Sequence, residues 1–244
     1  MSMKKKKTFS VYEETCNYLQ EQGTCLKAFE QCSSTSTLAK TEALKAPESV
    51  KIYLANAQTV GRGRGKNLWL NPAPGDGLLG TWSFRVPSPP QAITAPRIGL
   101  ATYEALLENF PEAKFSIKAP NDIYLGDKKI LGLLIETVSQ ADRHRLIVGI
   151  GLNVFSHPSQ VKHAGHLNES VNLNKKLWLD FLKSLESQWR DALQDAMAPH
   201  LTLEQRERLL FALNKNPLLQ KEYVSVSPFG DLATENQTVS WRDL

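Results

Sequence analysis

The chain has 244 residues, of which 41% are hydrophobic and 22% are charged, a balance that is ordinary for a globular protein. The formal net charge is +4, and the run Lys4–Lys7 alone supplies four positive charges. The rest of the chain is formally neutral, which excludes the basic surface of a protein that binds nucleic acid through charge.

The N-terminal residues 1–8 are predicted to form a basic disordered tail, because short blocks of like charge are usually solvated. Thr8–Gln22 is too polar for a signal peptide, and the longest mostly apolar stretch, Leu146–Phe155, is too short to cross a membrane. Neither the three cysteines nor the five histidines match a zinc-binding pattern. We therefore expect free thiols, surface positions for His163 and His166, and a cytoplasmic protein.

The first predicted strand, Val50–Ala55, alternates apolar and polar residues and leads into a loop rich in glycine and arginine, Gly61–Lys66. A second strand, roughly Leu78–Val86, ends at a group of prolines that cannot continue a sheet interior. The helical spacing of apolar residues over Leu100–Phe110 then predicts a helix that ends before Pro111.

The next strand-like segments decide the fold class, because no crossover helix fits between them. They are Phe115–Lys118, Ile123–Leu125, Lys129–Thr137 and Arg145–Val154. Gly126-Asp127 is suited to a two-residue hairpin turn, and the polar segment Ser139–His144 makes a second reversal. Parallel strands would need connections of roughly a dozen residues or more. We therefore predict an α+β fold with a mixed, mainly antiparallel sheet and helices on one face.

The last part of the chain begins with a strongly amphipathic segment, which we interpret as a helix packed on the core. Its apolar stripe is Trp178, Phe181, Leu182, Leu185, Trp189 and Ala192. Leu203–Leu213 is expected to be a short helix, and Tyr223–Val226 and Thr238–Trp241 are expected to be small strands. We predict one main domain over residues 9–198 and a short C-terminal module over residues 199–244.

Two glycine patterns resemble nucleotide-binding motifs but do not fit them. Gly61–Asn67 has one residue too few between its glycines for a phosphate loop, and Asn67 stands where a magnesium-binding hydroxyl is needed. Gly75–Gly80 matches a dinucleotide fingerprint, but a strand follows it instead of a helix.

The segment Gln58–Arg64 still has the composition of an anion-binding loop. Gly61 and Gly63 let the backbone approach a ligand, and Arg62 and Arg64 carry permanent charges suited to carboxylate or phosphate. From this segment alone, a flexible surface loop fits equally well.

Further along the chain, polar residues and glycines recur at the ends of predicted strands. Lys129 begins an otherwise apolar strand, where a charge is costly unless it is paired. Gly132 indicates close approach by a ligand or by backbone, and Asn153 places an amide where the next strand ends. Each feature alone has a structural explanation, but together they place arginines, lysines, glycine amides and an asparagine on neighbouring strand ends.

The order of five short motifs resembles the catalytic domain of biotin protein ligases. The motifs are Ser34-Thr35, Gln58–Arg64, Lys118–Asp122, Lys129–Gly132 and Gly149–Asn153. The resemblance covers about Leu26–Phe155. It implies the fold shared with class II aminoacyl-tRNA synthetases and lipoate ligases, with residues 9–198 as the catalytic domain and residues 199–244 as an abbreviated C-terminal module.

Carried over residue by residue, the resemblance implies three sets of site residues. Those expected to act in catalysis are Lys129, Arg64 and Arg62. Those expected to bind biotin are Ser34, Thr35, Ser36, Gln58, Gly61, Arg62, Gly63, Arg64, Lys129, Gly132 and Gly151. Those expected to bind ATP are Arg62, Arg64, Lys118, Asn121, Asp122 and Asn153. Mg²⁺ is implied as the companion of ATP, without assigned ligands.

The resemblance also implies an activity in two steps. Biotin and ATP would give biotinyl-5′-AMP and pyrophosphate, and biotin would then be transferred to a lysine of a biotin carboxyl carrier protein, that of acetyl-CoA carboxylase or a related carboxylase. A monomer or homodimer in the cytoplasm is expected, with neither specific DNA nor a membrane as partner.

The sequence departs from the family pattern at Ser36, where asparagine is usual, at Ala119, where tryptophan is usual, and at Gly65–Asn67, which replaces a more basic loop end. Two alternatives stay open: a lipoate or octanoate ligase of the same fold, and a degenerate paralogue that binds biotin without transferring it. A ligase that also represses transcription would need a winged helix-turn-helix before Ser34, and we expect none in the residues that precede it.

Overall fold

The computed structural model describes residues 7–194 and 198–244, which form two compact units. Unit 1 comprises the chain up to Pro89 together with Ile130–Leu179, and unit 2 comprises Pro90–Lys129 and Asp180–Leu244. The predicted tail residues Lys4, Lys5 and Lys6 lie outside the described residues. Lys7 is described, and its ammonium group forms an ion pair with Asp76 at 2.7 Å.

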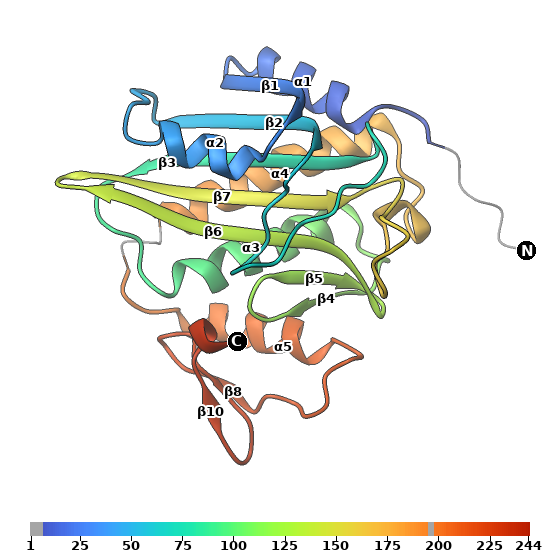
Figure 1. Cartoon of the computed structure of the whole chain (residues 1–244). Helices are drawn as coiled ribbons and strands as arrows, with labels where there is room; N and C mark the ends of the chain where they lie inside the picture. Colours follow the sequence, from blue (N-terminus) through green and yellow to red (C-terminus); the bar gives the residue numbers. More distant parts are fainter. Residues whose placement is uncertain (1–6, 195–197) are drawn as a thin grey trace, which may run out of the picture. The chain divides into compact units, whose positions relative to one another are not determined.

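Unit 1 is built on a mixed sheet, in which the strand order is β1-β2-β3-β7-β6 (Figure 1). Strands β1 and β2 are parallel, and the other neighbouring pairs are antiparallel. The mixed, mainly antiparallel sheet that the sequence predicts is therefore confirmed. The bounds are β1 (Cys25–Cys32), β2 (Val50–Gln58), β3 (Gly77–Val86), β6 (Lys128–Gln140, beginning in unit 2) and β7 (Arg143–Asn153).

Helices α1 (Val11–Glu21) and α2 (Thr35–Glu42) also belong to unit 1, and α2 lies in front of β2, β3 and β7 in Figure 1. Ala39 and Ala43 bury against Tyr53 and Ile147, which point to that side of the sheet. The residues that alternate with these, such as Ile52, are buried on the other side. Both faces of the sheet are thus covered. The prediction of helices on one face is therefore wrong. The sequence does not reveal α2, because this helix is short and polar and has no apolar stripe.

Unit 2 contains helices and short strands. They are α3 (Thr94–Asn109), β4 (Phe115–Lys118), β5 (Asp122–Leu125), α4 (Lys175–Gln194, beginning in unit 1), α5 (Leu203–Asn214), β8 (Ser225–Val226), β9 (Leu232–Ala233), β10 (Thr238–Val239) and the 3-10 helix η3 (Trp241–Asp243). The predicted turn after β5 is confirmed, since Gly126 has a φ of 59°. The aromatic stripe of α4 is buried, as predicted.

The second reversal is tighter than the sequence indicates. Strand β6 runs to Gln140 and β7 resumes at Arg143, so only Ala141 and Asp142 connect them, and Ala141 takes a φ of 51°. The long strands extend the antiparallel pairing to this turn and place Gly132 opposite Gly151 near their other ends.

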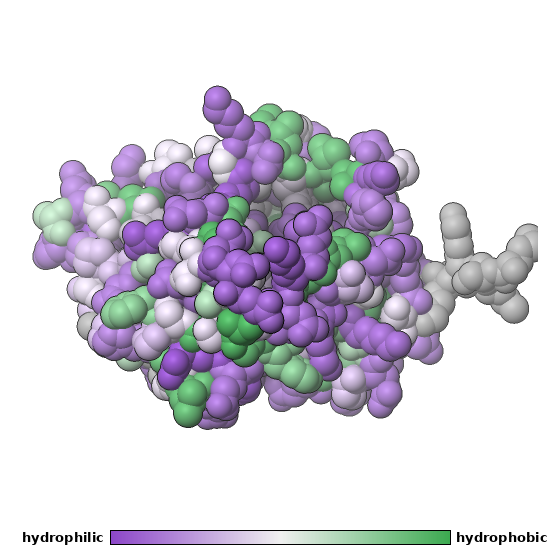
Figure 2. All heavy atoms as spheres, turned by 90° about the horizontal axis from the view of Figure 1, so that it is seen from below, coloured by the Kyte–Doolittle hydropathy of each residue, from purple (hydrophilic) through white to green (hydrophobic). Residues whose placement is uncertain are grey.

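No helix among the described residues is long and apolar enough to cross a bilayer. Figure 2 shows one face of the molecule, on which hydrophilic residues predominate and apolar residues appear in small separate areas. This face therefore carries no broad apolar surface among the described residues.

Candidate active site

A chain of hydroxyl groups links α2 to the sheet of unit 1. Thr81 Oγ1 donates to Thr35 Oγ1 at 2.9 Å, and Thr35 Oγ1 donates to Gln58 Oε1 at 3.3 Å. Ser36 Oγ lies 3.1 Å from Thr81 Oγ1. Because the single proton of Thr81 is given to Thr35, Ser36 must be the donor to Thr81. The four side chains form one directed network, which we call the hydroxyl chain.

The hydroxyl chain is held by local backbone structure. Ser34 begins α2, and its hydroxyl accepts a hydrogen bond from the Thr37 N–H. Gln58 ends β2, and its Oε1 also accepts from the Thr35 N–H at 2.8 Å. Ser34, Thr35 and Ser36 are buried. The predicted residues Ser34, Thr35, Ser36 and Gln58 are therefore gathered at one place.

Two glycines of β7 let other segments come close to this strand, and Gly149 lies against the hydroxyl chain. A Cβ atom on Gly149 would come 2.7 Å from Ser36 Oγ, and one on Gly151 would come 2.3 Å from the Trp69 indole. Carbon atoms do not approach so closely, so glycine is needed for α2 and Trp69 to rest directly on the strand. The sequence predicts that a ligand or backbone approaches Gly132 closely. The structure shows such an approach, by Trp69, at Gly151, which is the cross-strand partner of Gly132.

The glycine-arginine loop folds back as a hairpin. The Trp69 N–H donates to the Gly61 carbonyl at 2.9 Å, and the Gly63 N–H donates to the Asn67 carbonyl at 2.9 Å. A Cβ on Gly61 would meet the Trp69 carbonyl oxygen at 2.5 Å, so the returning arm requires a glycine there. Half-buried Arg64 lies at the turn, just before Gly65.

Arg62 ties this hairpin to β6. Its guanidinium donates two hydrogen bonds to the Glu136 carboxylate at 2.8 and 2.9 Å, and Lys40 of α2 donates a third at 2.8 Å. Burial alone would raise the pKa of Glu136, but Arg62 and Lys40 outweigh it and hold that pKa below its ordinary value. Glu136 therefore joins three segments of unit 1, which are the hairpin, β6 and α2.

A second group of predicted site residues lies in unit 2. Lys129 Nζ forms an ion pair with Asp122 Oδ1 at 2.7 Å, which supplies the partner that a charge at the start of an apolar strand requires. Burial raises the pKa of Asp122, although Lys129 and Lys118 oppose this shift. Lys118 Nζ lies 5.6 Å from the centre of the Tyr124 ring. Asn121 lies half-buried between β4 and β5.

Asn153 ends β7 and is buried. Its Nδ2 donates to the Gly165 carbonyl at 3.0 Å, and its Oδ1 has no hydrogen-bond partner among the residues that the structure describes. A buried amide oxygen left in this way can accept a hydrogen bond or coordinate a cation.

Thr81 and Trp69 are two site residues that the motifs do not include. Thr81 is a fully buried polar residue inside an apolar strand, and this contrast is a signal in the sequence. Trp69 is the one aromatic residue between Gln58 and Gly77, but only the folded hairpin shows that it covers Gly151.

Comparison with known proteins adds to this geometry. The model of the biotin/lipoate A/B protein ligase family matches residues 28–153. The bifunctional ligase/repressor BirA of Bacillus subtilis is 36% identical over 118 residues, which are 47% of this chain and 35% of that protein. The chain thus spans about a third of the length of this relative and of the BirA of Bacillus spizizenii.

Two solved structures resemble most of the chain. A biotin protein ligase from Aquifex aeolicus in complex with biotin and ATP has a TM-score of 0.65 at 25% identity, covering 88% of this chain and 94% of that one. A biotin protein ligase from Leishmania major in complex with biotinyl-5-AMP has a TM-score of 0.59 at 25% identity, covering 86% of this chain and 94% of that one.

Proposed function

The chain belongs to the biotin/lipoate A/B protein ligase family, and on that premise we propose that it is an ATP-dependent biotin protein ligase. In the first step an oxygen of the biotin carboxylate attacks the α-phosphorus of ATP. The new O–P bond replaces the bond to pyrophosphate, and biotinyl-5′-AMP forms. In the second step the amine of a carrier lysine attacks the acyl carbon, an amide forms, and AMP leaves as the amine loses a proton.

The observation that carries the choice of biotin is the hydroxyl chain, in which Ser36, Thr81, Thr35 and Gln58 are hydrogen-bonded in series. The ureido ring of biotin has donors and an acceptor that such groups can bind. A lipoyl or octanoyl chain has none at that end and would gain no hydrogen bond from these groups. The hydroxyl chain therefore supports biotin over lipoate.

The cationic residues have separate roles in this proposal. Lys129 stabilises the charge that develops at the α-phosphate, and Arg64 at the turn of the hairpin retains the adenylate. Arg62, which is bidentate to Glu136, holds the beginning of that hairpin in position. Lys118, Asn121 and Asp122 are assigned to the nucleotide.

Mg²⁺ enters the proposal with ATP. It prefers oxygen ligands, and Asn153 offers a buried Oδ1 with no hydrogen-bond partner among the described residues. When bound, the ion would offset the negative charge of the phosphates. Asn153 would hold it or the nucleotide at the end of β7.

The proposed protein partner is a biotin carboxyl carrier protein, and the cytoplasm is the proposed location, because ATP and carboxylase subunits occur there. The test is to incubate the chain with ATP, Mg²⁺, a biotin carboxyl carrier domain and either biotin, lipoate or octanoate, and to weigh the carrier by mass spectrometry. We expect the mass of one biotinyl group and no lipoyl or octanoyl group.

Lipoylation or octanoylation in place of biotinylation would contradict the choice of substrate. An unmodified carrier, with biotin bound by the chain, would instead identify a paralogue that binds biotin without transferring it.

A further inference from the structure

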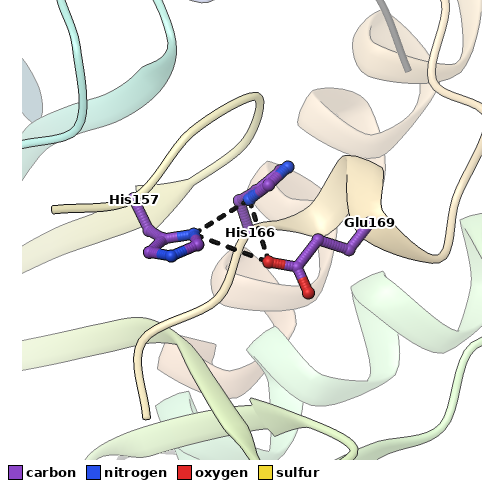
Figure 3. Close-up of side chains that lie close together, drawn as sticks. All are labelled: His157, His166 and Glu169. Carbon is purple, nitrogen blue, oxygen red and sulfur yellow. Dashed lines mark hydrogen bonds and ion pairs between the residues drawn. The ribbon is translucent and has the colours of Figure 1, made fainter. Parts of the chain in front are cut away.

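Three side chains of types that can ligate a metal ion converge in the segment that joins β7 to α4, as Figure 3 shows. His157 Nδ1 lies 3.0 Å from His166 Nδ1. Glu169 Oε1 lies 3.0 Å from His166 Nδ1 and 3.5 Å from His157 Nδ1. The three atoms form a compact triangle within unit 1, and none of these residues belongs to the proposed ligase site.

The size of this triangle fits the coordination of one divalent metal ion. Zinc binds imidazole nitrogen and carboxylate oxygen at about 2.0–2.2 Å, so neighbouring ligand atoms lie about 3.3–3.5 Å apart around a tetrahedral ion. Octahedral coordination at similar lengths gives about 2.9–3.1 Å between neighbours. Two of the observed separations, at 3.0 Å, match the octahedral range, and the third, at 3.5 Å, matches the tetrahedral range, so the triangle has the size of an irregular coordination sphere.

The chemistry of the donor set is equally suitable. Two imidazoles and one carboxylate suit first-row transition metals, which favour nitrogen ligands, better than Mg²⁺ or Ca²⁺, which favour oxygen. Without an ion, a proton must lie between the two Nδ1 atoms, because two lone pairs repel at 3.0 Å. An ion would bind both lone pairs and place a water molecule in the remaining position.

The backbone around the triangle is fixed before any ion binds. The Asn168 N–H donates to the Val154 carbonyl at 2.9 Å, and the side chain of Asn153 donates to the Gly165 carbonyl at 3.0 Å. The Glu169 N–H donates to the His166 carbonyl at the 3-10 helix η1 (Leu167–Glu169), and Leu167 is fully buried. Ligands held in this way lose little freedom when they coordinate an ion.

We propose that His157, His166 and Glu169 bind one first-row divalent transition-metal ion, with Zn²⁺ as the probe, and that this ion stabilises the β7–α4 segment. His163 is exposed, as the sequence predicts, whereas His166 is only partly exposed. The spacing, His157-x8-His166-x2-Glu169, matches no familiar zinc motif, because the ligands come from an irregular loop and a 3-10 turn.

The test measures Zn²⁺ binding to the untagged full chain by calorimetry, after a chelator has been added and removed. We expect one ion per chain and a higher midpoint of thermal unfolding with Zn²⁺. His166→Ala and His157→Ala should each weaken binding more than about a hundredfold, because even loss of an outer-shell partner costs about 10–100-fold. Glu169→Gln keeps the size of the side chain and should also weaken binding.

His163→Asn is the matched control. His163 lies in the same segment, is exposed, and has a φ of 62°, which asparagine tolerates. The His163→Asn variant should bind Zn²⁺ with the same affinity as the wild type. Visible bands of the Co²⁺ form should report the coordination geometry and disappear in His166→Ala.

Binding that survives in the double variant His157→Ala/His166→Ala would place the ion elsewhere, for example at the cysteines, and would overturn the proposal. The absence of Zn²⁺ binding to the folded wild-type chain would also overturn the proposal. His157, His166 and Glu169 would then be a hydrogen-bonded cluster only. Ligase activity is not part of the readout, so the outcome is independent of the proposed function.

Discussion

At the scale of single residues, Lys129 should determine how fast the adenylate forms. It stands beside Asp122 at 2.7 Å, and a cation near the α-phosphate stabilises the charge of the transition state. We predict that Lys129→Ala slows biotin-dependent exchange between ATP and pyrophosphate by about a hundredfold or more, or about 3 kcal/mol. Lys128→Ala is the control, because neighbouring residues of a strand point to opposite faces. Equal exchange by wild type and Lys129→Ala would contradict the role.

Arg64 should determine how long the adenylate is kept. It lies at the turn of the hairpin, between Gly63 and Gly65, where a positive charge can cover a bound anion. Arg64→Gly is expected to form biotinyl-5′-AMP and release it, so that lysines of an unrelated added protein become biotinylated. Lys66→Gly, at the same turn, should label far less. The measurement is blotting of the bystander protein with streptavidin, and no difference between the two variants would count against this role.

At the scale of elements, the hairpin is fastened to β6 and α2 through Glu136. Its pKa is lowered in the folded chain, so the stabilisation is present above the ordinary carboxyl pKa of 4.5 and is lost as the pH falls below it. We predict that Glu136→Gln loses on the order of 1 kcal/mol of stability at pH 7, given the partial exposure of the pairs. Unfolding midpoints of the two proteins should converge on acidification towards pH 3. A constant difference would show that Glu136 is not the titrating group.

The elements also show which parts of the molecule are readable from the sequence. Strands β2 to β7 alternate or run apolar between turns, and that pattern predicts them. β1 and α2 are missed, because β1 is a largely exposed edge strand and α2 is short and polar. The glycine motifs locate the site, whereas Thr81 and Trp69 join it only through the register of β3 with β7 and the folding of the hairpin.

At the scale of the whole molecule, the C-terminal residues are integrated into unit 2. The buried Arg97 of α3 donates to the carbonyls of Ala198 and His200, the first at 2.9 Å, and Arg208 of α5 forms an ion pair with Glu104 at 3.1 Å. We predict that Arg97→Ala lowers the free energy of unfolding by about 2 kcal/mol or more, because hydrogen bonds to a charged group are lost. Chemical denaturation measures the free energy of unfolding, and Arg208→Ala is expected to lower it less because Arg208 is exposed.

The boundary between a main domain and a C-terminal module at residue 198 stays a prediction.

Native mass spectrometry of the full chain, mixed with biotin, ATP and Mg²⁺ without a carrier, tests the central claim most directly. The proposed function predicts a complex of one chain with one biotinyl-5′-AMP and the release of pyrophosphate. Replacing biotin with lipoate or octanoate should give no adenylate. A complex that holds unreacted biotin, or an adenylate formed only from lipoate or octanoate, would contradict the assignment of this chain as a biotin protein ligase.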